Sequence, residues 1–188
     1  SEEENMAGNP TDAAVWGGAD VLIAPIGSPI PVGNAAFSAA WKYVGLLDGG
    51  QGFEESIETT STDHEAWGYG VIATTYKGTK VTKTFTALEE NAVVMGLVYD
   101  VSGMTFDDTL GTYVGDLKVR DNTTRVLVAF VTTSGTTVRR MITKNYATIA
   151  ATAAGSESEE ALASKGFTAT IVPDASKTLY YTYKGASL

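Results

Sequence analysis

The alternation of apolar and polar residues predicts a chain built mainly from β-strands. In residues 79–86, valine, lysine and phenylalanine alternate with threonine, so one face of that segment is polar along its length. Residues 69–76 form a second run of this kind, and Lys77-Gly78 between them is a compact hairpin signal. We therefore expect the two runs to pair as a hairpin.

Further strands are expected on both sides of this hairpin. A first strand begins near Asp20, and a second segment covers residues 37–47. Residues 126–131 are apolar at every position, which is typical of a strand covered on both faces. The later strands are expected at residues 113–120, 124–133 and 137–146, with a hairpin turn at Ser134-Gly135, and as a final pair at 167–172 and 178–183.

A single helix is predicted in the middle of the chain. The sequence TALE at residues 86–89 matches a capping box, in which a threonine hydroxyl and a glutamate carboxylate accept hydrogen bonds from free backbone N–H groups. The helix would cover about residues 87–99. One apolar stripe would run along it, formed by Leu88, Ala92, Met95 and Tyr99.

These elements predict a mainly β fold of one domain. Residues 1–18 mix Glu, Asn, Gly and Pro without periodicity and are expected to form a flexible N-terminal arm. Residues 19–188 are long enough for one domain with its own core. We expect an antiparallel β-sandwich or open barrel with one flanking α-helix.

Residues 53–67 form an acidic segment with little to bury. Ile57 is its only aliphatic residue besides Ala66, yet Phe53 and Trp67 bracket it. One interpretation is a solvated loop or hairpin. The other is a segment that becomes ordered only when a partner subunit covers it.

The charge distribution argues against nucleic-acid binding. The formal net charge is −9; residues 1–66 hold 11 acidic residues and one basic residue, and residues 67–188 hold 11 acidic and 12 basic residues. Binding to nucleic acid is driven by basic groups that displace counterions from phosphates. The acidic start is unlike a secretion signal, and no apolar run reaches 18 residues, so we expect a protein made in a cytoplasm with no membrane span.

The sequence gives no convincing set of catalytic or metal-binding residues. Cysteine is absent, and His64 is the only histidine, which we expect to be solvated within its acidic segment. A hard-cation site at Asp100, Asp107 and Asp108 lacks the ligand spacing that such sites need. Three tyrosines could offer a sugar-stacking face, but packing in the core is favoured for Tyr180, Tyr181 and Tyr183. We expect no enzymatic activity, cofactor or metal.

Four segments, in their order and spacing, resemble the major tail proteins of long-tailed bacteriophages. The first strand and turn are similar at residues 17–27, GGADVLIAPIG, as is the segment WKYVGLL at residues 41–47. A strand running into a helix follows at residues 83–91, KTFTALEEN, and the closing strand and turn are FTATIVPD at residues 167–174. The likeness covers about residues 17–184.

The resemblance implies a structural role in a virion. Proteins of that family form a β-sandwich with a flanking helix, share this fold with the type VI secretion tube protein, and assemble into hexameric rings whose strands join in an inner barrel. The rings stack into a helical tube through which the genome passes without specific binding. The implied partners are further copies of the chain and the tail tip, tape measure and tail terminator proteins. The implied location is the virion tail, assembled in the host bacterial cytoplasm.

Three groups of residues are candidates for this assembly. The acidic segment is expected to contact the next ring through Asp48, Phe53, Glu54, Glu55, Glu58, Asp63, Glu65 and Trp67. Its expected basic docking positions are Lys77, Lys80, Lys83, Arg139 and Arg140, and the expected lumen-facing row is Thr82, Thr84 and Thr86. Trp16 is the expected contact of the N-terminal arm with a neighbour.

Other classes of protein remain open from the sequence. A capsid decoration protein, or a tail-completion or head-tail connector protein, is the closer alternative and would stop at a single ring. A carbohydrate-binding β-sandwich is a more distant alternative, since it would need a secretion signal. A small enzyme on a β scaffold would need a polar cluster that the chain does not offer.

Overall fold

The computed structural model describes residues 13–187 except 122–123, 153–154, 156 and 161. Within the described part the fold is mainly β, and the paired strands are all antiparallel. Nine strands form one sheet that does not close into a barrel. The predicted fold class is therefore confirmed at the level of an open, antiparallel, mainly β architecture.

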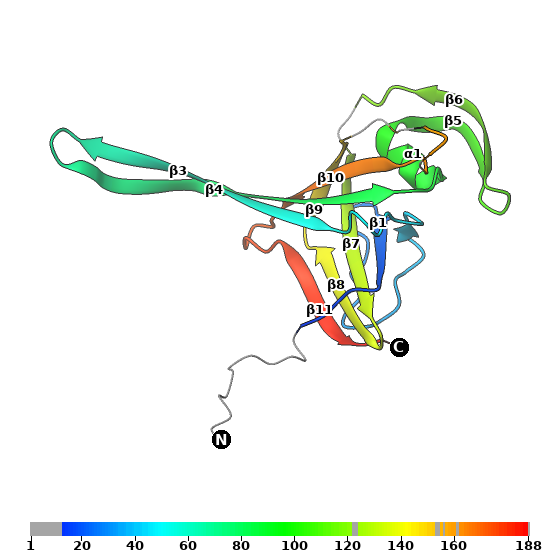
Figure 1. The fold of residues 1–188 in the computed structure, drawn as a ribbon, viewed down its shortest axis with the longest axis horizontal. Helices are drawn as coiled ribbons and strands as arrows, with labels where there is room; N and C mark the ends of the chain where they lie inside the picture. Colours follow the sequence, from blue (N-terminus) through cyan, green and yellow to red (C-terminus); the bar gives the residue numbers. More distant parts are fainter. Residues whose placement is uncertain (1–12, 122–123, 153–154, 156, 161, 188) are drawn as a thin grey trace, which may run out of the picture.

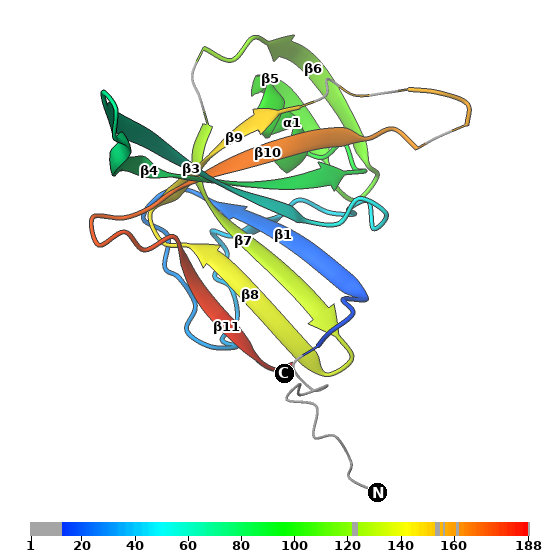
Figure 2. The same ribbon diagram turned by 60° about the vertical axis from the view of Figure 1, so that its left-hand side comes forward.

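The nine-stranded sheet folds over at β7, so that its two parts face each other (Figure 2). The part that we call sheet I contains β1 (Gly18–Ala24), β2 (Lys42–Tyr43), β7 (Thr124–Ser134), β8 (Thr137–Thr143) and β11 (Tyr180–Ala186). The part that we call sheet II contains β3 (Glu54–Ala66), β4 (Gly70–Ala87), β10 (Lys165–Val172), β9 (Tyr146–Ala151) and the first residues of β7.

The main core lies between the two sheets. Phe130 of sheet I meets Phe85 of sheet II with ring centroids 6.2 Å apart, and Phe85 stacks on Phe167 at 5.2 Å. A second, smaller core covers the other face of sheet I, where Trp41 packs on Leu22 and Ile142. Segment 25–41 therefore covers the outer face of sheet I. Sheet I thus buries apolar side chains on both of its faces, which stabilises the fold.

The helix is shorter than predicted and begins later. α1 covers Ala92–Val98, and the side chain of Asn91 caps it by accepting a hydrogen bond from the Val94 N–H at 3.0 Å. The expected start at residue 87 is wrong because Ala87 is still part of β4, where it pairs with Lys165. Glu89 does not act in a capping box; its carboxylate accepts the backbone N–H of Leu46 at 2.9 Å.

The predicted pairing of the central strands is also corrected. Residues 70–87 form one continuous strand, β4, and its partner is the acidic segment in β3. Thr60 pairs with Gly78 and Ser61 with Tyr76, so Lys77 is an unpaired bulge residue and not part of a turn. The acidic segment is thus half of a long hairpin, as the first interpretation of it required.

Two other expectations about strands need correction. Residues 137–146 divide into β8 and the start of β9, and residues 167–172 and 178–183 do not pair with each other. β10 lies in sheet II beside β4 and β9, whereas β11 lies in sheet I beside β8. The hairpin turn at Ser134-Gly135 is confirmed, because Ser134 pairs with Thr137.

A small hairpin that was only half predicted lies above α1 (Figure 1). It is formed by β5 (Asp100–Asp107) and β6 (Thr112–Lys118), which make a separate two-stranded sheet. The expected strand at residues 113–120 corresponds to β6. β5 was missed because it follows the helix directly.

Candidate functional site

The most distinctive feature of the molecule is the β3–β4 hairpin, which extends far beyond the body (Figure 1). We call its outer part, residues 57–80, the arm. Every residue of the arm is exposed or half-buried, although the two strands stay paired from Ile57–Val81 out to Ala66–Gly70. A two-stranded hairpin without cover is only marginally stable in water. The arm is therefore a segment that a partner would stabilise.

One face of the arm continues the core-facing surface of sheet II. Residues that pair directly share a face, so Ile57 lies beside the buried Val81, and Tyr76 follows further out. Ile57 and Tyr76 are 63% and 73% exposed. A hydrogen bond from the Thr74 hydroxyl to the Asp63 carboxylate, 2.7 Å long, ties the two strands together on this face. The core surface thus runs on past the body with nothing over it.

The tip of the arm carries the most exposed aromatic residues. Trp67 is fully exposed and Tyr69 nearly so, in a turn closed by a 3.0 Å hydrogen bond from the Tyr69 N–H to the Ala66 carbonyl. Gly68 and Gly70 have φ of 80° and 74°, a left-handed conformation that other residues rarely adopt. These glycines hold the two aromatic residues at the end of the hairpin.

Two lysines of the β3–β4 hairpin lie opposite acidic residues of the same hairpin. Glu58 lies directly opposite Lys80, and Glu55 opposite Lys83. The sequence-based hypothesis joined acidic residues on one ring to these lysines on another; for Lys80 and Lys83 the acidic neighbour is in the same chain. Lys77, at the bulge, remains an exposed cation of the arm.

Not all of the predicted inter-ring residues belong to the arm. Glu54 is exposed at its base, and Asp63 and Glu65 are exposed further out. Asp48 instead holds a turn by accepting the N–H of Gly50 at 2.9 Å. Phe53 packs edge-on against Phe130, with ring centroids 5.2 Å apart. Asp48 and Phe53 therefore lie before the arm and contact the body of the molecule.

Two of the predicted basic docking residues are buried, which corrects their assignment. Lys83 is 4% exposed in the core between the sheets. The guanidinium of Arg140 donates to the carbonyls of Ala35 and Gly33 at 2.6 and 3.2 Å, and so holds segment 25–41 in place. Neither side chain can reach another subunit without leaving these contacts, because a buried charge that loses its partners is costly.

Arg139 and Trp16 contact each other within the same chain. The guanidinium lies 4.7 Å from the centre of the indole ring, and the N–H of Gly17 donates to the carbonyl of Thr133 at 2.9 Å. The N-terminal segment that was predicted to be flexible, residues 1–18, therefore ends before its expected boundary, since β1 begins at Gly18. Residues 1–12 of that prediction lie outside the described residues. That Trp16 contacts a neighbouring copy stays a prediction.

The outward face of sheet II is covered with threonines. Thr82 pairs with Thr170 and Thr84 with Thr168, and Thr148 lies on the other side of Thr170. We call these residues, with Thr86, the threonine face; all six are half-buried. Charged residues lie at its margins: Glu54 is opposite Thr84, Arg125 is opposite Thr148, and Lys80, opposite Glu58, precedes Thr82 on the same face of β4.

The predicted row of Thr82, Thr84 and Thr86 is therefore one of three rows on a single surface. Sequence reasoning missed Thr148, Thr168 and Thr170, although the alternation in residues 167–172 gave the same polar signal. Hydroxyl groups at this density make a polar surface with no net charge. Such a surface can be wetted without holding an ionic ligand strongly.

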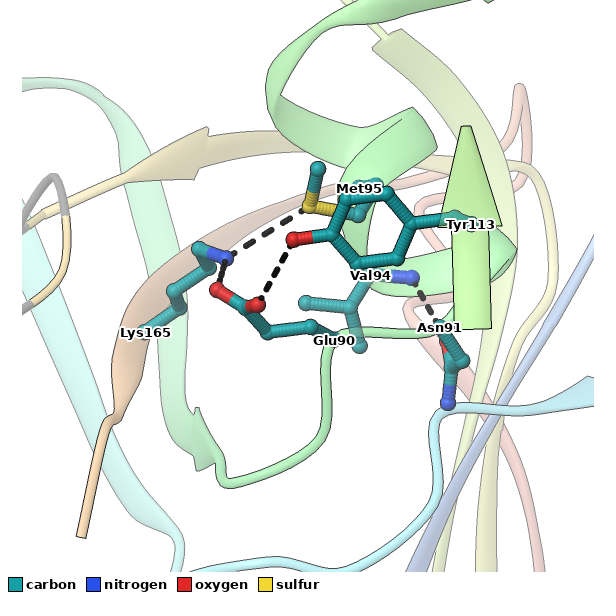
Figure 3. Close-up of polar contacts among 6 residues, drawn as sticks. All are labelled: Glu90, Asn91, Val94, Met95, Tyr113 and Lys165. Carbon is teal, nitrogen blue, oxygen red and sulfur yellow. Dashed lines mark hydrogen bonds and ion pairs between the residues drawn. The ribbon is translucent and has the colours of Figure 1, made fainter. Parts of the chain in front are cut away.

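A separate polar cluster connects the β5–β6 hairpin to the body (Figure 3). The Glu90 carboxylate accepts hydrogen bonds from the Lys165 ammonium at 2.7 Å and from the Tyr113 hydroxyl at 3.1 Å. The Lys165 nitrogen also lies 3.5 Å from the sulfur of Met95. The pKa of Glu90 is held below its usual value, and the largest cause is the hydrogen bond from Lys165. The cluster is a structural tie between β10, β6 and the start of α1.

The remaining candidate residues take no part in a site for chemistry. The ring of His64 shares a hydrogen bond of 2.9 Å with the Thr75 hydroxyl on the arm. Tyr180 and Tyr181 point into the two different cores, so the tyrosines do not form a common sugar-stacking face. In the part of the chain that the structure describes, no three acidic, histidine or cysteine side chains gather as metal ligands would.

The sequence matches no protein-family model, and no curated protein matches it significantly. Among the helices of the described residues, none has the length and apolar character needed to span a membrane.

Proposed function

We propose that this protein is the subunit of a phage tail tube, with the fold of the major tail proteins that its sequence resembles. It would have a structural role without catalysis, in the virion tail, and would assemble in the cytoplasm of a bacterial host. Copies of the chain would form hexameric rings that stack into a helical tube. Tail tip, tape measure and tail terminator proteins would be its further partners.

The observation that carries the proposal is the bare arm. Ile57 and Tyr76 lie on the same face as the core residues of sheet II but are exposed to solvent. Trp67, at the tip of the arm, is also exposed. Large exposed apolar surfaces on a folded chain mark contacts with other proteins. When the arm of one copy contacts a different surface of the next, the contact is heterologous and can repeat without limit, as a filament requires.

The threonine face supports a role as the wall of a channel. Its six hydroxyl groups carry no charge, the basic residues Arg125 and Lys80 lie only at its margins, and the net charge of the chain is −9. A wall of this kind would let DNA pass without trapping it, because basic side chains are what bind the DNA backbone. Sheet II would then face the lumen, and segment 25–41, which covers sheet I, would face outward.

The test is negative-stain electron microscopy of the purified protein at increasing concentration, with and without added salt. Hollow tubes of uniform width are the expected result. Single rings that never stack would instead favour a capsid decoration, tail-completion or head-tail connector protein. Monomers under every condition would contradict self-assembly.

A pair of substitutions tests whether the arm makes the contact. Tyr76→Ser on the arm is expected to abolish or shorten the tubes, because it removes apolar surface that a second copy would cover. Val32→Ser is the matched control, since Val32 has a similar exposure of 76% but lies in segment 25–41. Equal tube formation by the two variants would exclude Tyr76 from the interface.

A further inference from the structure

Lys83 carries a charge at a position where the strand pattern calls for an apolar residue. It lies on the core face of β4 between Val81 and Phe85, and it is 4% exposed. Its nitrogen is 4.7 Å from the centre of the Phe130 ring and 3.4 Å from the sulfur of Met141. Burial lowers the pKa of Lys83 because the charged form is poorly solvated there. A buried amine needs partners that offset its lost hydration, and the origin of those partners shows which elements Lys83 joins.

The partners of Lys83 come from the two outermost strands of the open sheet. β3 and β11 are the ends of its strand order, and no strand pairing joins them. Glu55 of β3 places a carboxylate oxygen 3.8 Å from the Lys83 nitrogen. The same oxygen accepts the hydroxyl of Tyr180, on β11, at 3.2 Å. Side chains therefore join the two edges where backbone hydrogen bonds do not.

This junction lies at the base of the arm. Glu55 is two residues before Ile57, where the arm begins, and Tyr180 belongs to sheet I. The pKa of Tyr180 is raised, first by its burial and then by Glu55, so the phenol remains a hydrogen-bond donor over the physiological pH range. Among the described residues, the charge of Arg139 also acts on Lys83, and this like charge lowers the pKa of Lys83 further.

We propose that Lys83, Glu55 and Tyr180 form a latch that fixes the direction in which the arm leaves the body. The latch connects the edge strand that becomes the arm to the opposite sheet. Without it, the arm would still be paired, but its base could swing relative to sheet I. These three are positioning residues, and the proposal does not depend on what the arm binds.

The test measures the arm directly in the monomer. The chain has no cysteine, so Thr60→Cys on the arm and Thr136→Cys at the β7–β8 turn give two unique sites for spin labels. Pulsed electron paramagnetic resonance at low protein concentration then gives the distribution of distances between them. We expect one narrow distribution in the otherwise unchanged protein. Glu55→Gln and Tyr180→Phe are each expected to widen it and to shift its maximum.

The matched control is Glu54→Gln. Glu54 is adjacent and acidic, but it lies on the opposite face of β3, beside Thr84 of the threonine face. A distribution as narrow in Glu55→Gln as in Glu54→Gln would overturn the latch. Circular dichroism checks that each variant is folded; should Glu55→Gln fail to fold, Tyr180→Phe decides, because it removes only a hydroxyl. Tube formation is scored separately, so failure of the latch and failure of the proposed function are distinguishable.

Discussion

Buried cations in this molecule each join segments that are distant in sequence. Lys83 connects β3 to β11 through Glu55 and Tyr180, and Lys165 connects β10 to the β5–β6 hairpin through Glu90. Arg140 holds segment 25–41 through two carbonyl groups. Each of these side chains has a carboxylate, carbonyl or aromatic partner. Within the described residues, the Nε of Arg140 is nevertheless buried without a hydrogen-bond partner.

At the residue scale, the contribution of Glu90 to stability should depend on pH. Its pKa is lowered, so the ionised form is favoured in the folded protein, and the contribution is present above the ordinary glutamate pKa of about 4.3. It is lost as the pH falls through the lowered folded-state value. The side chain is 42% exposed, so solvent screening keeps the effect small.

Urea unfolding of the wild type and Glu90→Gln measures this. We expect the wild type to be more stable at about pH 7, and the difference to shrink as the pH falls below the ordinary glutamate pKa of about 4.3 and through the lowered folded-state pKa. Glu65→Gln, which removes one carboxylate from the exposed arm, is the matched control. A difference that grows towards acid pH would contradict the assigned direction.

At the element scale, α1 shows how one side chain can set where a helix begins. The Asn91 carbonyl oxygen accepts the Val94 N–H, and its amide nitrogen donates to the Val44 carbonyl at 2.8 Å. The same residue therefore caps the helix and anchors it to the segment that follows β2. A helix of seven residues has little stability of its own, so it depends on this cap and on its packing.

Asn91→Ala is expected to lower the free energy of unfolding by about 1–2 kcal/mol, since it removes the cap and leaves the Val44 carbonyl without its donor. Asn91→Asp keeps the acceptor for the cap but loses the donor and brings a carboxylate close to the Glu89 carboxylate and the Val44 carbonyl, so it should recover only part of the loss. Chemical denaturation of the three proteins measures the effect. Equal stability of Asn91→Ala and the wild type would mean that packing alone sets the start of α1.

At the scale of the whole molecule, a compact two-sheet body carries a long uncovered hairpin (Figures 1 and 2). The body buries its large aromatic residues, such as Phe85, Phe130 and Phe167, whereas the arm exposes Tyr76 and Trp67. The body therefore hides its large aromatic side chains from solvent, and the arm exposes its own. In the proposed assembly, the arm would gain stability when another copy covers it.

Trp67 should report this change. If the arm is covered on assembly, acrylamide quenching of Trp67 fluorescence should fall as the protein concentration rises. Trp41 is buried in the second core and Trp16 is half-buried under Arg139, so subtracting the signal of Trp67→Phe isolates the tip. Unchanged quenching in samples that contain tubes would place the tip outside the interface.

The sequence by itself determined the features that depend on near neighbours. The mainly β content, the turn at Ser134-Gly135 and the polar row of Thr82, Thr84 and Thr86 all follow from local alternation and turn chemistry. Alternation along a strand fixes which side chains share a face, because successive residues point to opposite sides. The threonine face was predictable to this extent.

Only the tertiary structure decided which strands pair and which charges are buried. Lys77-Gly78 resembles a turn, yet the strand continues through it as a bulge because the acidic segment supplies a longer partner. Lys83 resembles a surface lysine, yet its neighbours in space are Phe130, Met141, Glu55 and Tyr180 from other strands. Strand pairing and burial arise from residues far apart in the chain, so local pattern cannot specify them.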